Sequence, residues 1–180
     1  MSYFTMVSSF QETFDLSQPG PPVDDVRKFA DNFNHLEEEL REIYEAYQNN
    51  DIAKVADGLG DLVYVALGIM HKCGIPADEV IEVIHRANMA KEKGETLKDG
   101  KHGVVKPEGW RSPEPAIASI LVNAKAKYEL KDFLNEHGSR EPEEEGSYVC
   151  YWLHKHEPPF RFLKTDSPVF ILKQLKQYIK

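Results

Sequence analysis

Acidic residues crowd one stretch of the chain, LEEELREIYEAYQNNDIAKVADGLGDLVYV, which covers residues 36–65. Glu39 and Glu42 are three positions apart, and Asp57 and Asp61 are four apart, so each pair lies on one side of a helix. Carboxylates held close together repel one another unless a cation lies among them. Magnesium and manganese prefer such oxygen ligands. The spacing therefore suggests a metal site, with an ordinary solvated acidic face as the alternative.

Two helices must position these acids. Apolar residues recur every three or four positions from about residue 23 to 48 and again over 52–73, which is the period of a helix. Residues 49–51, Asn-Asn-Asp, predict a short turn, which makes the two helices antiparallel neighbours. Gly58 and Gly60 lie inside the second helix, where each costs about 1 kcal/mol relative to alanine. A glycine there lets another backbone or a ligand approach closely.

The remaining segments are predicted from breakers and periodicity. Gly74 is a helix stop, and Pro76 begins a third helix that ends near Lys91. The rest of the chain predicts an irregular N-terminus (1–22), a loop or tail (92–115), a helix (116–135), an acidic linker (136–146), two strands (147–154 and 160–165) and a last helix (167–180).

Composition narrows the class of protein. The chain has 180 residues, of which 41% are hydrophobic, which suits one packed domain with a modest appendage. Its net charge of −8 argues against general binding to nucleic acid. Cys73 and Cys150 are too far apart in sequence to suggest a disulfide framework or a zinc motif. The N-terminus does not resemble a signal peptide, and the longest apolar stretch, 62–70, is too short to span a membrane. We therefore expect a cytoplasmic protein with no membrane partner.

Four motifs in order give the chain a family resemblance. They are LEEELREI (36–43), DGLGDLVYV (57–65), IHRANMAK (84–91) and DGKHGVVKPEGW (99–110). Together they resemble the MazG-like all-α nucleoside triphosphate pyrophosphohydrolases, in a subgroup common in phages and bacteria, over roughly residues 5–115. If a phage encodes the chain, the host cytoplasm is the expected location.

The resemblance implies a mainly α fold, an antiparallel helical bundle, to which the two predicted strands and the last helix add a small α+β C-terminal extension. It divides the chain into a pyrophosphohydrolase domain (1–115) and an extension of unknown role (116–180). It implies assembly as a homodimer or homotetramer. The implied reaction is cleavage of a nucleoside triphosphate between its α- and β-phosphates, which yields a nucleoside monophosphate and pyrophosphate.

The resemblance also assigns a metal site. Glu39 and Glu42 form the ExxE motif and, with Asp57 and Asp61, would hold Mg²⁺, for which Mn²⁺ can substitute. Glu38 would be a further ligand or a general base.

Glu38 and Glu39 are thus the predicted catalytic residues. The second motif departs from the family pattern, because the usual acid three residues before Asp61 is Gly58 here. Asp57 is the expected substitute.

Substrate phosphates need cationic neighbours. The resemblance points to Asn88 and Lys91, although polar residues also commonly satisfy a helix C-terminus. Further candidates for substrate contacts are the cations Lys54, Lys98, Lys101, Lys106 and Arg111 and the aromatic residues Tyr64 and Trp110, with core packing as the alternative for Tyr64.

Two other functions stay open at this point. Glu82 and His85 form an ExxH motif of the kind used by di-iron carboxylate bundles, but the chain has no second copy on a suitable helix. The other alternative is a non-enzymatic helical interaction module whose acids are solvated and bind no metal.

Overall fold

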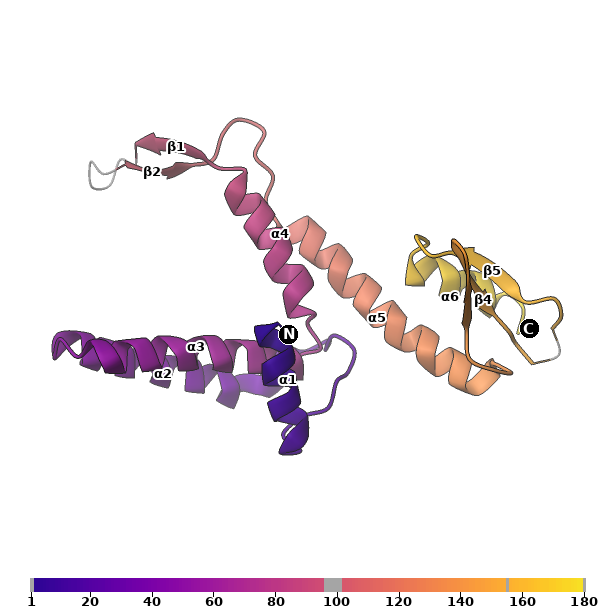
Figure 1. Ribbon diagram of the computed structural model, residues 1–180, viewed down its shortest axis with the longest axis horizontal. Helices are drawn as coiled ribbons and strands as arrows, with labels where there is room; N and C mark the ends of the chain where they lie inside the picture. The colour runs from indigo at the N-terminus through magenta and orange to yellow at the C-terminus, as the bar shows by residue number, and fades with distance from the viewer. Residues whose placement is uncertain (1, 96–101, 155, 180) are drawn as a thin grey trace. The chain divides into compact units, whose positions relative to one another are not determined.

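A computed structural model describes residues 2–95, 102–154 and 156–179 of the chain. The chain separates into two compact units, residues 1–120 and 121–180. Six α-helices and two small sheets make up the regular structure of the described residues, so the fold is mainly α with a small α+β C-terminal part (Figure 1). The domain boundary after residue 115 stays a prediction.

Helix α1 (Tyr3–Thr13) corrects the prediction of an irregular N-terminus. The Ser2 hydroxyl caps it by accepting a hydrogen bond from the Thr5 amide, at 3.1 Å. Val7 is buried against Leu67 of helix α3 (Ile52–Lys72). The helix escaped prediction because a polar residue, Gln11, occupies the buried face one turn after Val7 and interrupts the apolar pattern.

Helices α2 (Ala30–Gln48) and α3 form the predicted antiparallel hairpin (Figure 1). A short 3₁₀ turn, Val26–Phe29, precedes α2, so the helix begins later than predicted. Asn50 adopts a left-handed conformation in the turn between the helices. The Asp51 carboxylate then caps α3 by accepting a hydrogen bond from the Lys54 amide, at 3.1 Å.

Gly58 is the point of close contact between α2 and α3. A Cβ atom at this position would lie 2.7 Å from Cγ1 of Ile43 and would overlap it. A Cβ atom at Gly60 would meet no atom within 4 Å. The two glycines therefore differ, because only Gly58 is required for the helices to pack at this distance.

Gly74 follows the end of α3 and is the helix stop that the sequence predicted. It has a φ angle of +66°, and the Pro21 carbonyl oxygen would lie 2.3 Å from a Cβ atom there. The segment before α2 thus runs against the end of α3, and the Val23 amide donates a hydrogen bond to the Cys73 carbonyl oxygen at 3.1 Å. Helix α4 (Ala77–Met89) follows.

The segment that the sequence predicted as a loop or tail, 92–115, contains two short strands in its described part. Strands β1 (Glu92–Glu95) and β2 (His102–Val105) pair antiparallel, with Lys93 opposite Val104. The strands are short and rich in charged residues and glycine, and such a composition gives little strand signal in the sequence.

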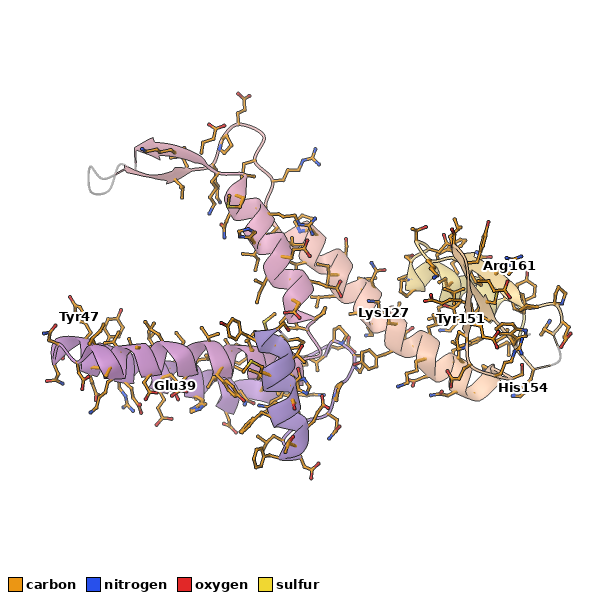
Figure 2. The ribbon with its side chains drawn as sticks, in the orientation of Figure 1. Glu39, Tyr47, Lys127, Tyr151, His154 and Arg161 are labelled. Carbon is orange, nitrogen blue, oxygen red and sulfur yellow. The ribbon has the colours of Figure 1, made fainter. Side chains whose placement is uncertain are left out.

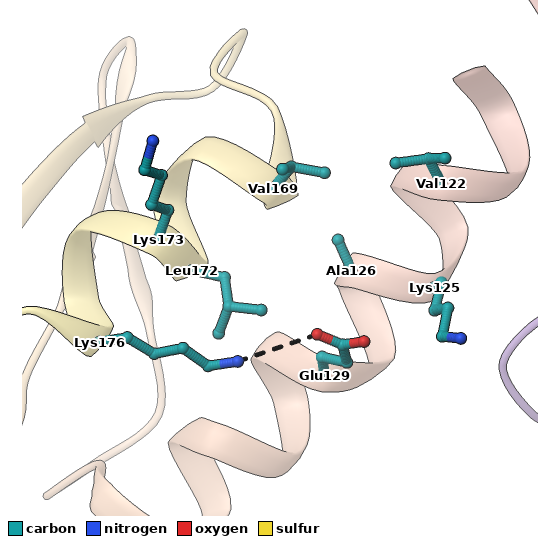
Figure 3. Close-up of a pocket in the computed structure, with 8 residues that line it drawn as sticks. All are labelled: Val122, Lys125, Ala126, Glu129, Val169, Leu172, Lys173 and Lys176. Carbon is teal, nitrogen blue, oxygen red and sulfur yellow. Dashed lines mark ion pairs between the residues drawn. The ribbon is translucent and has the colours of Figure 1, made fainter.

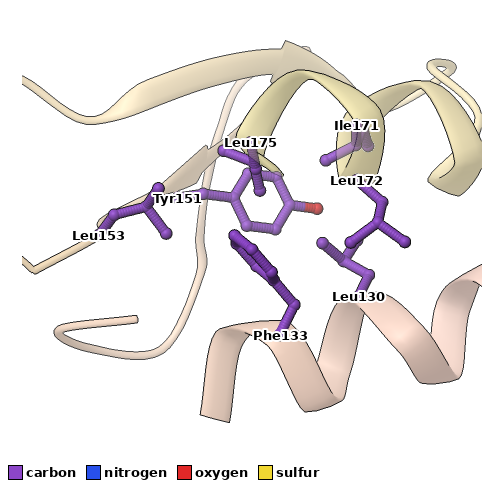
Figure 4. Close-up of a cluster of buried hydrophobic side chains, with 7 residues drawn as sticks. All are labelled: Leu130, Phe133, Tyr151, Leu153, Ile171, Leu172 and Leu175. Atoms are coloured by element: carbon purple, nitrogen blue, oxygen red, sulfur yellow. The ribbon is translucent and has the colours of Figure 1, made fainter. Parts of the chain in front are cut away.

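The second unit contains most of helix α5 (Glu114–His137), which is longer than predicted. Three antiparallel strands follow in the order β3 (Glu143–Glu145), β4 (Tyr148–Tyr151) and β5 (Phe160–Leu163), and helix α6 (Pro168–Lys176) ends the unit. Side chains from α5, β4 and α6, together with Leu153 just after β4, form the core of the unit (Figure 4). They are Leu130, Phe133, Tyr151, Leu153, Ile171, Leu172 and Leu175.

Strand β3 falls where the sequence predicted an acidic linker. Its three glutamates are poor strand formers, but they pair with cations on neighbouring segments. Glu145 lies 3.4 Å from the Arg161 guanidinium, and Glu144 pairs with Lys164. Charged side chains on an edge strand also oppose pairing with a second chain.

Both cysteines are buried and free. Burial raises the pKa of the Cys73 thiol and of the Cys150 thiol, so both stay protonated at neutral pH. No helix in the described ranges combines the length and the apolar character that crossing a membrane requires.

The two glycines of α3 generate a matched pair of predictions. Gly60→Ala should raise the free energy of unfolding by about 0.5–1 kcal/mol, because alanine favours the helix and the site is open. Gly58→Ala should lower it by about 1 kcal/mol, because overpacking against Ile43 outweighs the helix preference. Urea denaturation measures both.

The control is the same Gly58→Ala change in an Ile43→Ala background, where the overlapping atom is absent. There the alanine should be neutral or stabilising. Equal effects of Gly58→Ala in both backgrounds would contradict the assignment of the contact.

Candidate active site

The Ile43–Gly58 contact sets where the predicted acids lie. A helix turns about 100° per residue, so Glu39, one turn before Ile43, and Asp61, three residues after Gly58, each flank the line of contact. Because the helices are antiparallel, both flanks are on the same side of the hairpin. Glu42 and Asp57 lie on that side too, about 100° from the contact on their own helices.

Glu39 is the most enclosed of the four acids. Its side chain is 13% exposed, whereas Glu42, Asp57 and Asp61 are exposed. Figure 2 shows Glu39 on α2. A carboxylate enclosed by its neighbours is held in fewer orientations than an exposed one, so Glu39 is the most restrained of the four predicted ligands.

His35 is a residue that the sequence analysis missed. Its Nε2 atom lies 3.5 Å from a Glu39 carboxylate oxygen, and its Nδ1 atom lies 3.5 Å from a Glu38 oxygen. The spacing of three and four residues to the two glutamates was the available signal. His35 thus lies beside both predicted catalytic glutamates, one turn earlier on α2.

The four acids suit magnesium by type, since all donate hard carboxylate oxygens from one side of a hairpin. They are not gathered into a closed cage. Within the described ranges, no three His, Cys, Asp or Glu side chains lie close enough together to hold one ion. The ligand set of Glu39, Glu42, Asp57 and Asp61 therefore stays a prediction.

Lys54 and Tyr64 extend the same side of α3. Lys54 precedes Asp57 by three residues and Asp61 by seven, so the three side chains form a row. The Tyr64 ring packs edge-on against Phe10 of α1, with ring centroids 5.6 Å apart. Tyr64 therefore has the packing contact that was the alternative to base stacking.

A second group of predicted residues meets at the C-terminal end of α4. The Lys91 ammonium donates a hydrogen bond to the Asn88 side-chain oxygen at 2.8 Å. The Lys106 ammonium lies 4.3 Å from the centre of the Trp110 ring, and that of Lys91 lies 6.0 Å from it. The structure thus brings two predicted substrate residues, Lys91 and Lys106, to the ring of a third, Trp110.

Trp110 fixes this arrangement. Its indole N–H donates a hydrogen bond to the Ala87 carbonyl oxygen at 2.8 Å, which ties residues 106–110 to the last turn of α4. Lys98 and Lys101 lie outside the described residues. No ion pair joins Lys91 or Lys106 to the acids of α2 and α3 among the described residues. The site therefore has an acidic part and a basic part on different elements.

Residues 7–88 match the family model of phosphoribosyl-ATP pyrophosphohydrolase, a family of the MazG-like all-α nucleoside triphosphate pyrophosphohydrolase superfamily. The match spans most of α1 and all of α2 and α3, and it ends one residue before the end of α4. It covers less than half of the chain and none of the second unit. A search of curated proteins found no match.

The matched segment is thus similar to a domain of the MazG-like superfamily, and this similarity indicates a pyrophosphohydrolase that acts on a nucleotide. The hairpin with its four acids lies entirely inside the match.

The geometry at Gly58 generates a prediction about the ligands. Asp57→Asn should weaken Mn²⁺ binding nearly as much as Asp61→Asn, because both carboxylates lie on the same side of α3. Gly58→Glu in the Asp57→Asn protein should not restore binding, because a side chain at position 58 points at Ile43 and not at the acids. Isothermal titration with Mn²⁺ measures each affinity.

Glu37→Gln is the matched control, because this substitution removes the same charge from the side of α2 that faces away from Glu39 and Glu42. It should bind Mn²⁺ as the unaltered protein does. Asp57→Asn with unchanged affinity would leave Asp57 as an ordinary surface acid.

Proposed function

We propose that this protein hydrolyses a nucleoside triphosphate, with Mg²⁺, between its α- and β-phosphates to give a nucleoside monophosphate and pyrophosphate. The observation that carries the proposal is the placement of four acids on one side of the α2–α3 hairpin, inside the segment that matches a pyrophosphohydrolase family. A solvated acidic face with no function would not need the helices to be held by a glycine contact beside those acids.

Each residue has a role in this proposal. Glu39, Glu42, Asp57 and Asp61 hold Mg²⁺, which when bound neutralises phosphate charge and makes a water more acidic. Glu38 is exposed beside Glu39 and accepts the proton of the attacking water. The water oxygen bonds to phosphorus, the bridging P–O bond breaks, and pyrophosphate leaves.

Lys91 and Lys106 bind phosphate oxygens at the end of α4, and Lys54 supplies a third cation beside Asp57. Asn88 orients Lys91 and offers its amide to the nucleoside. Trp110 holds Lys106 beside Lys91 through the bond to Ala87.

The name of the matched family adds phosphoribosyl-ATP to the substrates to be tested. That compound also carries a triphosphate, so the same acids and lysines can serve it.

The reaction test is a panel of common and damaged nucleoside triphosphates together with phosphoribosyl-ATP, each incubated with Mg²⁺. We expect release of pyrophosphate, not orthophosphate, from at least one of them. Glu42→Gln and Asp61→Asn should each lose most of the activity, roughly a hundredfold or more, because a charged ligand is lost. Glu37→Gln should keep it. Turnover to orthophosphate alone, or no turnover on the whole panel, would refute the proposal.

We also propose a homodimer, with a homotetramer as the larger form. Leu40 on α2 and Leu59 and Val63 on α3 are about half exposed, and they lie on the side of the hairpin opposite the acids. Ile69, further along α3, is buried within the chain. Leu40, Leu59 and Val63 therefore form an exposed apolar surface on the side of the hairpin away from the acids, where a second copy of the chain can bury it.

Leu59→Glu should convert the dimer to a monomer, because the new charge has no partner in an apolar interface. Light scattering measures the mass. Ala53→Glu adds the same charge to another face of the same helix and should leave the dimer intact. An unaltered protein that is monomeric and fully active would exclude this assembly as a requirement for function.

A further inference from the structure

A cavity in the second unit is not explained by the proposed reaction. It has a volume of about 630 Å³ and lies along the C-terminal half of α5 and the segment that follows it. We call it the Arg140 pocket; its lining includes Lys127, Leu130, Lys131, Leu134, Arg140 and Tyr151. The volume falls within the range of small-molecule sites. The family match ends at residue 88, so it assigns nothing here.

Cations predominate in the lining. Lys127, Lys131 and Arg140 line the pocket against one carboxylate, that of Glu141, although the chain as a whole has a net charge of −8. Lysines supply point charges, and the planar guanidinium of arginine matches the oxygens of a phosphate. The pocket therefore favours an anion.

Arg140 is held in position before any ligand arrives. Its guanidinium lies 3.7 Å from the centre of the Trp152 ring and 3.6 Å from a Glu143 carboxylate oxygen. A stacked arginine loses less freedom on binding than a mobile one. Its contact with Trp152 also makes that indole a natural reporter for the pocket.

The pocket has an apolar and aromatic part as well. Leu130 and Leu134 line it from α5, and Tyr151 lines it from β4. Figure 4 shows the Tyr151 ring lying between Phe133 and α6. Burial raises the pKa of the Tyr151 phenol, so its hydroxyl stays protonated at neutral pH. An anion with an organic body fits this lining better than a bare ion does.

A neighbouring cavity of about 420 Å³ provides the contrast (Figure 3). Its floor between α5 and α6 is apolar, formed by residues such as Val122 and Leu172, and one of its lysines, Lys176, lies 3.9 Å from Glu129. It also carries Lys125 and Lys173. Lys125 and Lys173 therefore serve as controls for Lys127 and Lys131, because they line a cavity that has no counterpart of Arg140 or Tyr151.

We propose that the Arg140 pocket binds a small organic phosphate, with Lys127, Lys131 and Arg140 on the phosphate and the leucines of α5 against the organic part. The site belongs to the second unit, and it stands or falls independently of the hydrolysis proposed for the first.

The test uses the full chain with Trp110→Phe, which leaves Trp152 as the sole tryptophan. Phenyl phosphate is the probe, and inorganic phosphate is the comparison, at constant ionic strength. We expect phenyl phosphate to change the fluorescence emission of Trp152. Its ³¹P NMR resonance should broaden when the protein is added. The protein should bind phenyl phosphate more tightly than inorganic phosphate.

In the same background, Lys127→Ala combined with Lys131→Ala should weaken phenyl phosphate binding roughly tenfold or more, because two charge-assisted contacts are lost. Lys125→Ala combined with Lys173→Ala removes equal charge at the neighbouring cavity and should change the affinity less than about twofold, as screened surface charges do.

Three results would overturn the proposal. They are equal losses in the two double variants, equal affinities for phenyl phosphate and inorganic phosphate, and no change in either emission or linewidth. Pyrophosphate release by the unaltered protein, which keeps Trp110, is measured in parallel and shows whether the first unit is functional whichever of these results is obtained.

Discussion

The contact between Ile43 and Gly58 is the constraint on which the first unit depends. It brings α2 and α3 to a separation that no larger residue at position 58 would permit. Through the helical repeat, it also fixes which residues flank the contact. The acids lie on one side of the hairpin and the half-exposed leucines and valine on the other. One interhelical contact thus separates a polar face suited to a metal from an apolar face suited to a second chain.

The same contact explains the departure from the family motif. An acid at position 58 would point into the helix interface, where Ile43 leaves no room. In this chain the position serves packing, and the acidic side chain stands one residue earlier, at Asp57. Under the proposed function, a metal ligand on this part of α3 has to come from a neighbouring position on the exposed face, which is where Asp57 stands.

The basic part of the site depends on a different interaction. The hydrogen bond from the Trp110 indole to the Ala87 carbonyl holds a segment that would otherwise extend from the β hairpin without contacts to α4. It places the two ammonium groups of Lys91 and Lys106 on one ring. Two cations held near each other repel, so the arrangement is more favourable when an anion lies between them. The second unit has its own core and its own paired charges.

The sequence by itself determined the helices of the hairpin, the turn at residues 49–51, the stop at Gly74 and the identity of the acids, because each of these follows from local periodicity, capping or spacing. It did not reveal α1, since Gln11 occupies a buried face, nor strand β3, since three glutamates form a strand only when Arg161 and Lys164 pair with them. The difference between Gly58 and Gly60 and the meeting of Lys106 with Lys91 at Trp110 were decided by tertiary structure alone. Such features depend on contacts between residues distant in the chain, and local sequence preference carries no record of those contacts.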